Sequence, residues 1–316
     1  MKSIYWVFTL KCNDFCDHCY NNSGPQGEVV DIADLLRVVP NLPDEGERLI
    51  LSGGEPLTEM GKLLTLLGAL KERYQGRVPI WLQTNGDLLN QRRLEKLLAT
   101  GVQRIDIASL DRFHRKKGTH INRLRSLFEE FGMRPADDSQ EGSATGLTYA
   151  MWGANEDLWL GGNWARGRAM ETQVSLLDPT HNFCALWSGA AGFLDDGSAQ
   201  QEVHIQLYRL YPCCPTTLYA LGDVRDERVE DILGRQRKYE AFRRLNQGDV
   251  YNLGRAEGLD SAYIRQRIDA LGDVCLWCDE YFDQHYQGPK GERRAEGLYD
   301  IELLEAPLVP ARDAAS

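Results

Sequence analysis

The sequence predicts an α/β fold in which parallel strands alternate with crossover helices. Over residues 4–153, short apolar or β-branched runs alternate with segments whose apolar residues recur every three or four positions. Each helical segment ends near Gly or Pro. Such alternation builds a parallel sheet, either closed as a barrel or open, and places functional loops at the carboxyl ends of the strands.

Five strands are expected in this half of the chain, at residues 4–10, 48–54, 78–86, 104–111 and 147–153. Four amphipathic helices are expected between them, at residues 31–39, 60–74, 92–101 and 121–133. The segments with chemically suggestive residues all follow one of these strands, which is where α/β active sites form.

The alternation stops near residue 170. The glycine-rich segment 161–170 predicts a domain junction, so we expect domains over 1–170 and 171–316. In the second domain we expect a hairpin within 193–215 and helices at about 228–246 and 260–271. The C-terminal tail is expected to be frayed.

Composition narrows the class of protein. No run approaches the ~18 apolar residues of a membrane span, and the apolar first strand lacks a signal-peptide cleavage site. We therefore expect a cytoplasmic protein with reduced thiols and no membrane partner. The basic segment 235–244 is one amphipathic helix face, so a nucleic-acid partner is not expected. The net charge of −11 either favours a cationic substrate or simply keeps the chain in solution.

Three cysteines with CxxxCxxC spacing follow the first predicted strand: Cys12, Cys16 and Cys19. A structural zinc site needs four ligands. His18 is a poor fourth ligand, because its neighbour Cys19 already serves and adjacent side chains rarely point the same way. An iron–sulfur cubane held by three thiolates leaves one iron open, where an exchangeable molecule can bind.

The segment CNDFCDHCYN resembles the cluster-binding loop of radical S-adenosylmethionine (SAM) enzymes. Three further segments match that family in order: SGGEP (52–56), LQTNGDLL (82–89) and ASLD (108–111). The resemblance implies a partial (β/α)6 TIM-like barrel with a small C-terminal iron–sulfur domain. It also implies a 4Fe–4S cluster whose open iron binds SAM, which one electron cleaves to a 5′-deoxyadenosyl radical.

The matching segments imply SAM contacts from residues that follow the second, third and fourth strands: Gly53, Gly54, Glu55, Pro56, Thr84, Asn85, Ser109 and Asp111. His18 and Tyr20 are expected to pack near the adenine. Arg168 is a candidate cofactor or substrate anchor, and Arg166 a candidate substrate anchor. Each segment also has a plain structural interpretation as a turn, a first helical turn or an exposed loop.

Five cysteines remain in the second half. A CxxC pair, Cys275 and Cys278, together with distant thiols in a reducing compartment suggests another metal site. The pattern resembles the twitch form of the SPASM extension, which implies one auxiliary 4Fe–4S cluster on Cys184, Cys213, Cys275 and Cys278. The long interval after Cys184 leaves Cys213 and Cys214 interchangeable as ligands. A zinc site on the same thiols, or buried cysteines without metal, are the alternatives.

The thiol left over, Cys214, separates two mechanisms. Beside a substrate radical it could donate a hydrogen atom and invert a stereocentre. Otherwise the radical must lose an electron, for which an auxiliary cluster is the natural acceptor. We expect the second course, a two-electron oxidation of an alcohol to a ketone, with Asp111 or His114 as the base.

The expected substrate is a small polar molecule resembling an aminocyclitol or aminoglycoside. The alternatives are a radical epimerase of the same substrate class, a maturase of a ribosomally made peptide, and a binding protein with structural metal sites. A low-potential electron donor such as flavodoxin or ferredoxin is the expected partner.

Overall fold

The fold is described in a computed structural model. The residues it describes are 2–108, 113–116, 119–136, 146–151, 164–175, 177–186, 192–195 and 201–294.

Nine strands of the described residues form one sheet in the order β5-β6-β4-β3-β2-β1-β7-β8-β9. Their bounds are β1 Ser3–Val7, β2 Arg48–Ser52, β3 Ile80–Thr84, β4 Val102–Ile107, β5 Arg134–Pro135, β6 Thr148–Met151, β7 Glu202–Gln206, β8 Arg209–Tyr211 and β9 Gly222–Asp223. Pairing is parallel from β5 through β7, and β8 and β9 add antiparallel. The parallel part matches the expected partial barrel.

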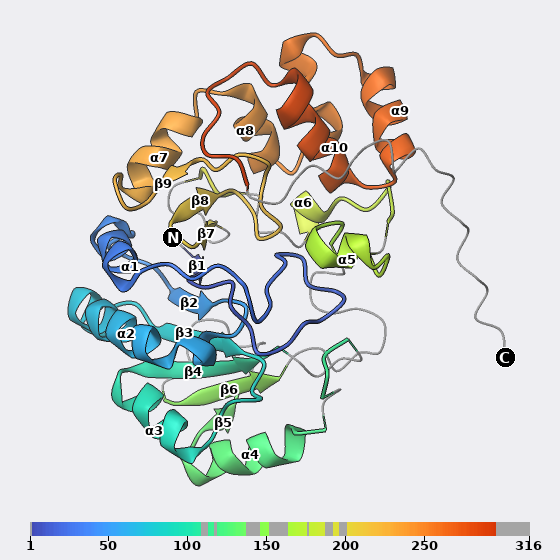
Figure 1. Cartoon of the computed structure of the whole chain (residues 1–316). Coiled ribbons are helices and arrows are strands. Elements are labelled where there is room, and N and C mark those ends of the chain that lie inside the picture. The colour runs from blue at the N-terminus through green and yellow to red at the C-terminus, as the bar shows by residue number, and fades with distance from the viewer. Residues whose placement is uncertain are drawn as a thin grey trace, which may run out of the picture.

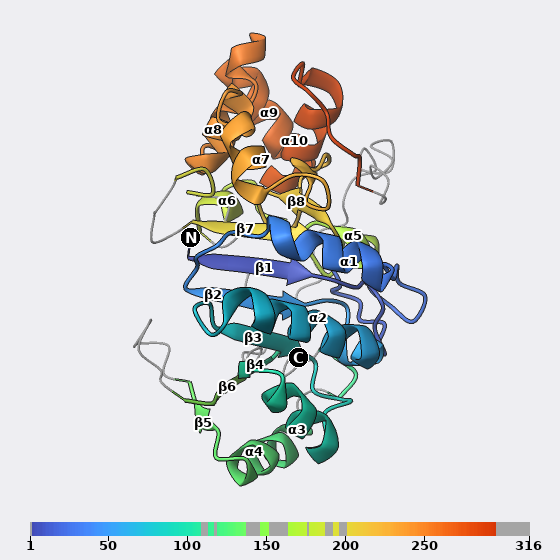
Figure 2. The ribbon, with the colours of Figure 1, turned by 90° about the vertical axis from the view of Figure 1, so that its left-hand side faces the viewer.

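Two groups of helices accompany the sheet. The first follows the parallel strands: α1 Ile32–Val38, α2 Met60–Tyr74, α3 Gln91–Ala99 and α4 Ile121–Glu130. The second gathers beyond the β7–β9 end, as Figures 1 and 2 both show: α7 Val229–Gln236, α8 Glu240–Asn246, α9 Ser261–Leu271 and α10 Val274–Glu280. The short helices α5 Gly167–Glu171 and α6 Phe183–Leu186 lie between the groups. No helix in the described ranges is long and apolar enough to cross a membrane.

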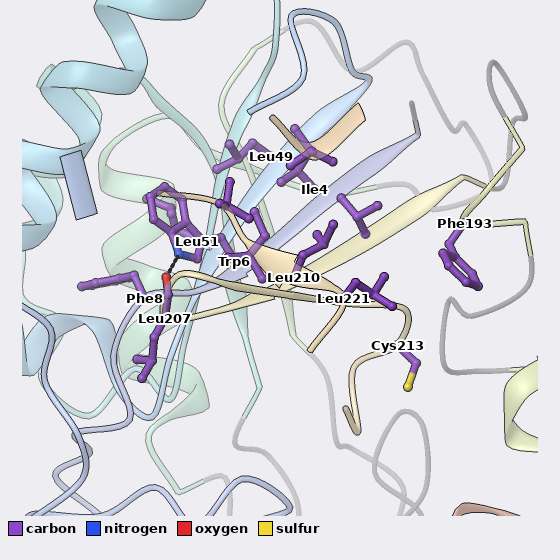
Figure 3. Close-up of a cluster of buried hydrophobic side chains, with 14 of the residues drawn as sticks. Ile4, Trp6, Phe8, Leu49, Leu51, Phe193, Leu207, Leu210, Cys213 and Leu221 are labelled. Atoms are coloured by element: carbon purple, nitrogen blue, oxygen red, sulfur yellow. Dashed lines mark hydrogen bonds between the residues drawn. The ribbon is translucent and has the colours of Figure 1, made fainter. Parts of the chain in front are cut away.

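The core is built by alternation along the strands. On β1, Ile4 and Trp6 are fully buried in the apolar cluster of Figure 3, where the Trp6 indole N–H donates to the Leu207 carbonyl at 2.7 Å. Tyr5, between them, points to the other face. Its hydroxyl donates to Ser52 Oγ of β2 at 2.8 Å and contacts Gln83 Oε1 of β3 at 3.0 Å. This polar face borders the candidate site.

The fold class predicted from the sequence is confirmed, and the five predicted strands correspond to β1, β2, β3, β4 and β6. The expected hairpin forms as β7–β8, but β7 also pairs in parallel with β1, so the second half extends the first sheet. The helix expected over 228–246 is two helices, α7 and α8. The boundary at residue 170 stays a prediction, and the C-terminal tail lies outside the described residues.

Candidate functional site

The three clustered cysteines lie in the segment between β1 and α1, residues 8–31, here called the cysteine loop. Its start packs against the chain after β2, where the Gly54 N–H donates to the Thr9 carbonyl at 2.8 Å. A Cβ on Gly54 would lie 2.6 Å from the Lys11 carbonyl oxygen, and one on Gly53 would lie 2.8 Å from that of Thr9. Both glycines are therefore required by the close approach of two backbone segments.

Helix α5 holds the other side of the cysteine loop. Gly167 has a φ of +50°, and a Cβ there would lie 2.5 Å from the Tyr20 carbonyl oxygen. The Arg168 guanidinium donates to the Cys16 carbonyl at 2.8 Å and to the Ser23 carbonyl at 2.7 Å. Arg168 thus braces the cysteine loop as well as lining the pocket beside it. The segment expected to be a domain junction fixes the shape of this loop.

One pocket is lined by residues of the cysteine loop, the ends of β2 and β3, and α5. It encloses about 790 Å³ of empty space, including the part open to solvent. All three thiols line it, together with these residues expected from the sequence: His18, Tyr20, Gly53, Gly54, Thr84, Asn85, His114 and Arg168. Four further lining residues lie on neighbouring strands or near α5 and were given no role from the sequence, although two of them belong to the matching segments 52–56 and 82–89: Tyr5, Ser52, Gln83 and Trp164.

The three thiols suit a cluster better than a single ion. Burial raises the pKa of Cys12 to about 12 and also raises the pKa of Cys16. The neighbouring thiols of the cysteine loop raise both values further. They would bind metal as thiolates, releasing protons. Within the described ranges, no three His, Cys, Asp or Glu side chains converge closely enough to chelate one metal ion. Three thiols around a shared cavity fit an iron–sulfur cluster, which spans more space than one zinc ion.

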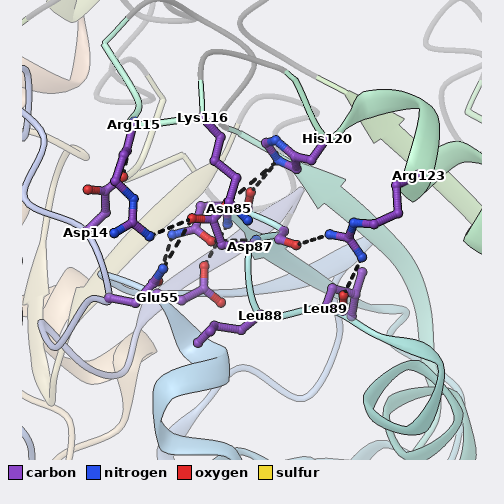
Figure 4. Close-up of polar contacts among 12 residues, drawn as sticks. Asp14, Glu55, Asn85, Asp87, Leu88, Leu89, Arg115, Lys116, His120 and Arg123 are labelled. Carbon is purple, nitrogen blue, oxygen red and sulfur yellow. Dashed lines mark hydrogen bonds and ion pairs between the residues drawn. The ribbon is translucent and has the colours of Figure 1, made fainter.

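Glu55 joins the ends of β2 and β3 behind the pocket (Figure 4). Its fully buried carboxylate accepts hydrogen bonds from the Thr84 hydroxyl at 2.7 Å, the Asn85 N–H at 2.7 Å and the Leu57 N–H at 3.0 Å. Burial raises the pKa of Glu55, and these hydrogen bonds oppose the rise. Neither Glu55 nor the buried Pro56 lines the pocket, so their side chains support the site from behind.

Asp87 ties the β3 end to the cysteine loop, a role that sequence reasoning missed. Its carboxylate lies 3.4 Å from Arg115 Nη2, 3.3 Å from Lys116 Nζ and 3.4 Å from Asn13 Nδ2. Asn13 in turn accepts a hydrogen bond from the Asn85 side chain at 2.9 Å. The only signal for Asp87 was its place directly after the Thr-Asn-Gly segment.

Two histidines meet at the edge of the pocket. The rings of His18 and His114 lie 4.7 Å apart, edge to face, and Phe113 packs 5.2 Å from His18. His114 is thereby brought to the pocket, as its candidate role requires. The other two candidates on this segment, Ser109 and Asp111, lie outside the described residues.

A comparison with models of protein families identifies the domain that contains the cysteine loop. Residues 6–125 match the model of the radical SAM superfamily. The protein contains a radical SAM domain. The cysteine loop and the ends of β2 and β3 lie within the match, and the pocket that they line is here called the radical SAM pocket. The family implies a 4Fe–4S cluster and SAM.

Curated relatives share only part of this length. The AdoMet-dependent heme synthase of Methanosarcina barkeri is 33% identical over 132 residues, which are 40% of this chain and 36% of the relative. The GTP 3′,8-cyclase of a Synechococcus species is 36% identical over 105 residues, which are 33% of this chain and 30% of the relative. The matched part thus spans about a third of the length of each of these relatives.

Among solved structures, BtrN in complex with AdoMet and 2-DOIA aligns with a TM-score of 0.46 and 17% identity. The alignment covers 83% of this chain and 90% of BtrN.

Four cysteines of the second half do not line the radical SAM pocket. Cys184, Cys213, Cys275 and Cys278, here called the auxiliary set, are all buried. Burial raises the pKa of each thiol, that of Cys184 to about 12, and the thiols raise one another's. Asp273 caps α10 by accepting the Cys275 N–H at 2.7 Å. Four buried thiols from three separate segments fit a cluster with four protein ligands.

Cys214, the remaining cysteine, lies beside a residue of the radical SAM pocket. Its Sγ lies 3.2 Å from the hydroxyl of Tyr20, a residue that lines the radical SAM pocket. Cys214 also interacts with His204 of β7, whose Nε2 lies 3.1 Å from Glu202 Oε1. Burial would lower the pKa of His204, but contacts with Cys214 and Glu202 outweigh it and raise the value to about 9. The structure therefore groups Cys213 with the auxiliary set and leaves Cys214 near the pocket.

Arg166 corrects one expectation from the sequence. It is only 2% exposed, and its guanidinium donates to the Cys275 carbonyl at 2.8 Å and contacts Asp279 Oδ1 at 3.1 Å. A buried side chain held by α10 cannot anchor a substrate in the radical SAM pocket. Its neighbour in the motif, Arg168, does line that pocket.

Proposed function

We propose that this radical SAM protein oxidises an alcohol of a small polar molecule to a ketone. A 5′-deoxyadenosyl radical would take the carbinol hydrogen, and the resulting substrate radical would lose its hydroxyl proton and one electron. The electron would pass to an auxiliary 4Fe–4S cluster. An aminocyclitol or aminoglycoside-like substrate suits the net charge of −11.

The auxiliary set carries this proposal. Four buried thiols can occupy all four irons of a cubane, which leaves no open corner for SAM or substrate. Such a cluster can exchange electrons but cannot bind the reactant.

A second candidate, radical epimerisation of the same substrate class, is favoured by one observation. Cys214 lies against Tyr20, at the margin of the pocket, where a thiol could return a hydrogen atom to a substrate radical. The two candidates differ in the fate of the substrate carbon. In D₂O, an epimerase would place deuterium on the inverted carbon, whereas the oxidase would release a ketone without it.

Both candidates need a low-potential electron donor, for which flavodoxin or ferredoxin is suited, and a reducing compartment such as the cytoplasm. The eight cysteines, all in described segments, form no disulfide, which fits such a compartment.

Three cysteine variants test the proposal in anaerobically reconstituted protein. Wild type should hold about eight irons per chain, as two cubanes require. Cys16→Ala should abolish 5′-deoxyadenosine formation from SAM. Cys275→Ala should keep that cleavage but stop product formation. Cys214→Ala is the matched control, because it should leave iron content, cleavage and oxidation intact but would stop an epimerase.

Two results would overturn the proposal that the protein oxidises an alcohol to a ketone. One is about four irons in the wild type, since the auxiliary set would then hold no cluster. The other is full product formation by Cys275→Ala.

A further inference from the structure

Arg166 lies between the radical SAM site and the auxiliary set. It is the extended residue before α5, with φ −149° and ψ 153°, and Arg168 follows in the first turn of that helix. Arg166 reaches the Cys275 carbonyl, and Arg168 reaches the Cys16 carbonyl, both at 2.8 Å. One short segment thus places a guanidinium against the backbone of a ligand loop at each of the two sites.

The charges around Arg166 are buried and few. Asp279 bridges two guanidinium groups, with Oδ1 at 3.1 Å from Arg166 and Oδ2 at 2.9 Å from Arg294. Both arginines are at most 5% exposed, and Asp279 is 3% exposed. Asp273 at the start of α10 is also buried and interacts with Arg166. Two cations and two anions, all of them buried, therefore lie beside the auxiliary set.

Arg166 lies against the helix that carries two cysteines of the auxiliary set. Its buried guanidinium donates to the backbone carbonyl of Cys275 at 2.8 Å and contacts Asp279, the residue directly after Cys278, at 3.1 Å. A permanent cation that favours negative charge on the sulfurs also favours an added electron on a cluster bound to them. In a buried site of low dielectric constant this attraction is strong, and net charge is one of the factors that set cluster potentials.

We propose that Arg166 raises the reduction potential of the cluster on the auxiliary set, so that this cluster can accept the electron of the substrate radical. This inference rests on the proposed function, because the cluster itself belongs to that proposal. The step would transfer one electron: the substrate radical would be oxidised and lose its hydroxyl proton, and a cluster held by the auxiliary set would accept the electron. Arg166 is a positioning residue here and touches no substrate.

The test isolates the auxiliary cluster. A full-length background variant with alanine at positions 12, 16 and 19 removes the radical SAM cluster, leaving the auxiliary set. In this background, Arg166→Gln removes the cation and Asp279→Asn removes its anionic partner. Arg166→Lys keeps the charge and serves as the matched control. Iron content is counted in each variant, and the midpoint potential is measured by redox titration monitored by electron paramagnetic resonance.

The two charge changes should move the potential in opposite directions. Arg166→Gln should make it more negative, with at least a tenfold change in the reduction equilibrium, which is about 59 mV for one electron. Asp279→Asn should make it more positive, and Arg166→Lys should stay near the background value. A purely structural role would damage the site in all variants with no such difference in sign.

The remaining outcomes separate the inference from the proposed function. No iron in the background variant overturns both the proposed function and this inference. About four irons with equal potentials in Arg166→Gln and Asp279→Asn overturns the role of Arg166 alone. If Arg166→Gln fails to hold iron, Asp279→Asn decides: a more positive potential supports the inference, and an unchanged or more negative one overturns it.

Discussion

Gly167→Ala should impair the radical SAM pocket although Gly167 itself does not line it. The φ of +50° at Gly167 costs an L-residue about 1–2 kcal/mol. The new Cβ would lie 2.5 Å from the Tyr20 carbonyl oxygen and 2.8 Å from that of Cys19, where real Cβ contacts below 3.0 Å are essentially absent. The cysteine loop must therefore move away from α5 by about half an ångström or more, carrying Cys19 with it.

A displacement of this size should matter because reactive groups need placement within about 0.5 Å. We expect a loss of roughly 10- to 100-fold in the rate of SAM cleavage. The assay is 5′-deoxyadenosine formation by dithionite-reduced protein, normalised to iron content. Gly68→Ala in the middle of α2 is the matched control: its Cβ meets nothing within 4 Å, so cleavage should be unchanged and stability should rise by about 1 kcal/mol. Wild-type cleavage by Gly167→Ala would refute the role assigned to α5.

Three other changes have definite expected results. Glu55→Gln should lower the free energy of unfolding by about 2 kcal/mol in urea titrations, since the new amide cannot accept every hydrogen bond, including that from the Asn85 N–H; an unchanged midpoint would contradict this. His204, with a pKa raised from 6.5 to about 9, should contribute about 3 kcal/mol to the stability of the metal-free chain below pH 6.5 and lose it as pH rises through 9. His204→Gln should abolish this pH dependence and Glu202→Gln should reduce it; a flat wild-type profile would refute the pairing. Arg168→Gln should lower the iron content from about eight to about four per chain, because the cysteine loop loses its brace; full iron retention would show the brace to be dispensable.

Much of the radical SAM site could be predicted because its signals are local. The cysteine spacing and the segments after β2 and β3 are each contained in a few residues, and the structure brings them to one pocket. The orientation of Glu55 was not predictable in this way. Its partners Thr84 and Asn85 lie on another strand, and nothing near residue 55 indicates which way the carboxylate turns.

The residues that were missed depend on long-range register. Tyr5, Ser52 and Gln83 meet because β1, β2 and β3 lie side by side and their alternating positions face the same way. The His204 ring lies 5.4 Å from that of Tyr5 only because β7 pairs with β1, which no local pattern indicated.

The position of β1 inside the sheet has a consequence for how the chain folds. Both of its edges are paired, one by β2 and the other by β7, which lies about 200 residues further along the chain. Until β7 has been synthesised, the strand that leads into the cysteine loop has a row of unsatisfied backbone groups along one side, an edge that invites pairing with other chains. A fragment ending at residue 170 should therefore aggregate, and iron insertion should be efficient only after the whole sheet has closed around β1.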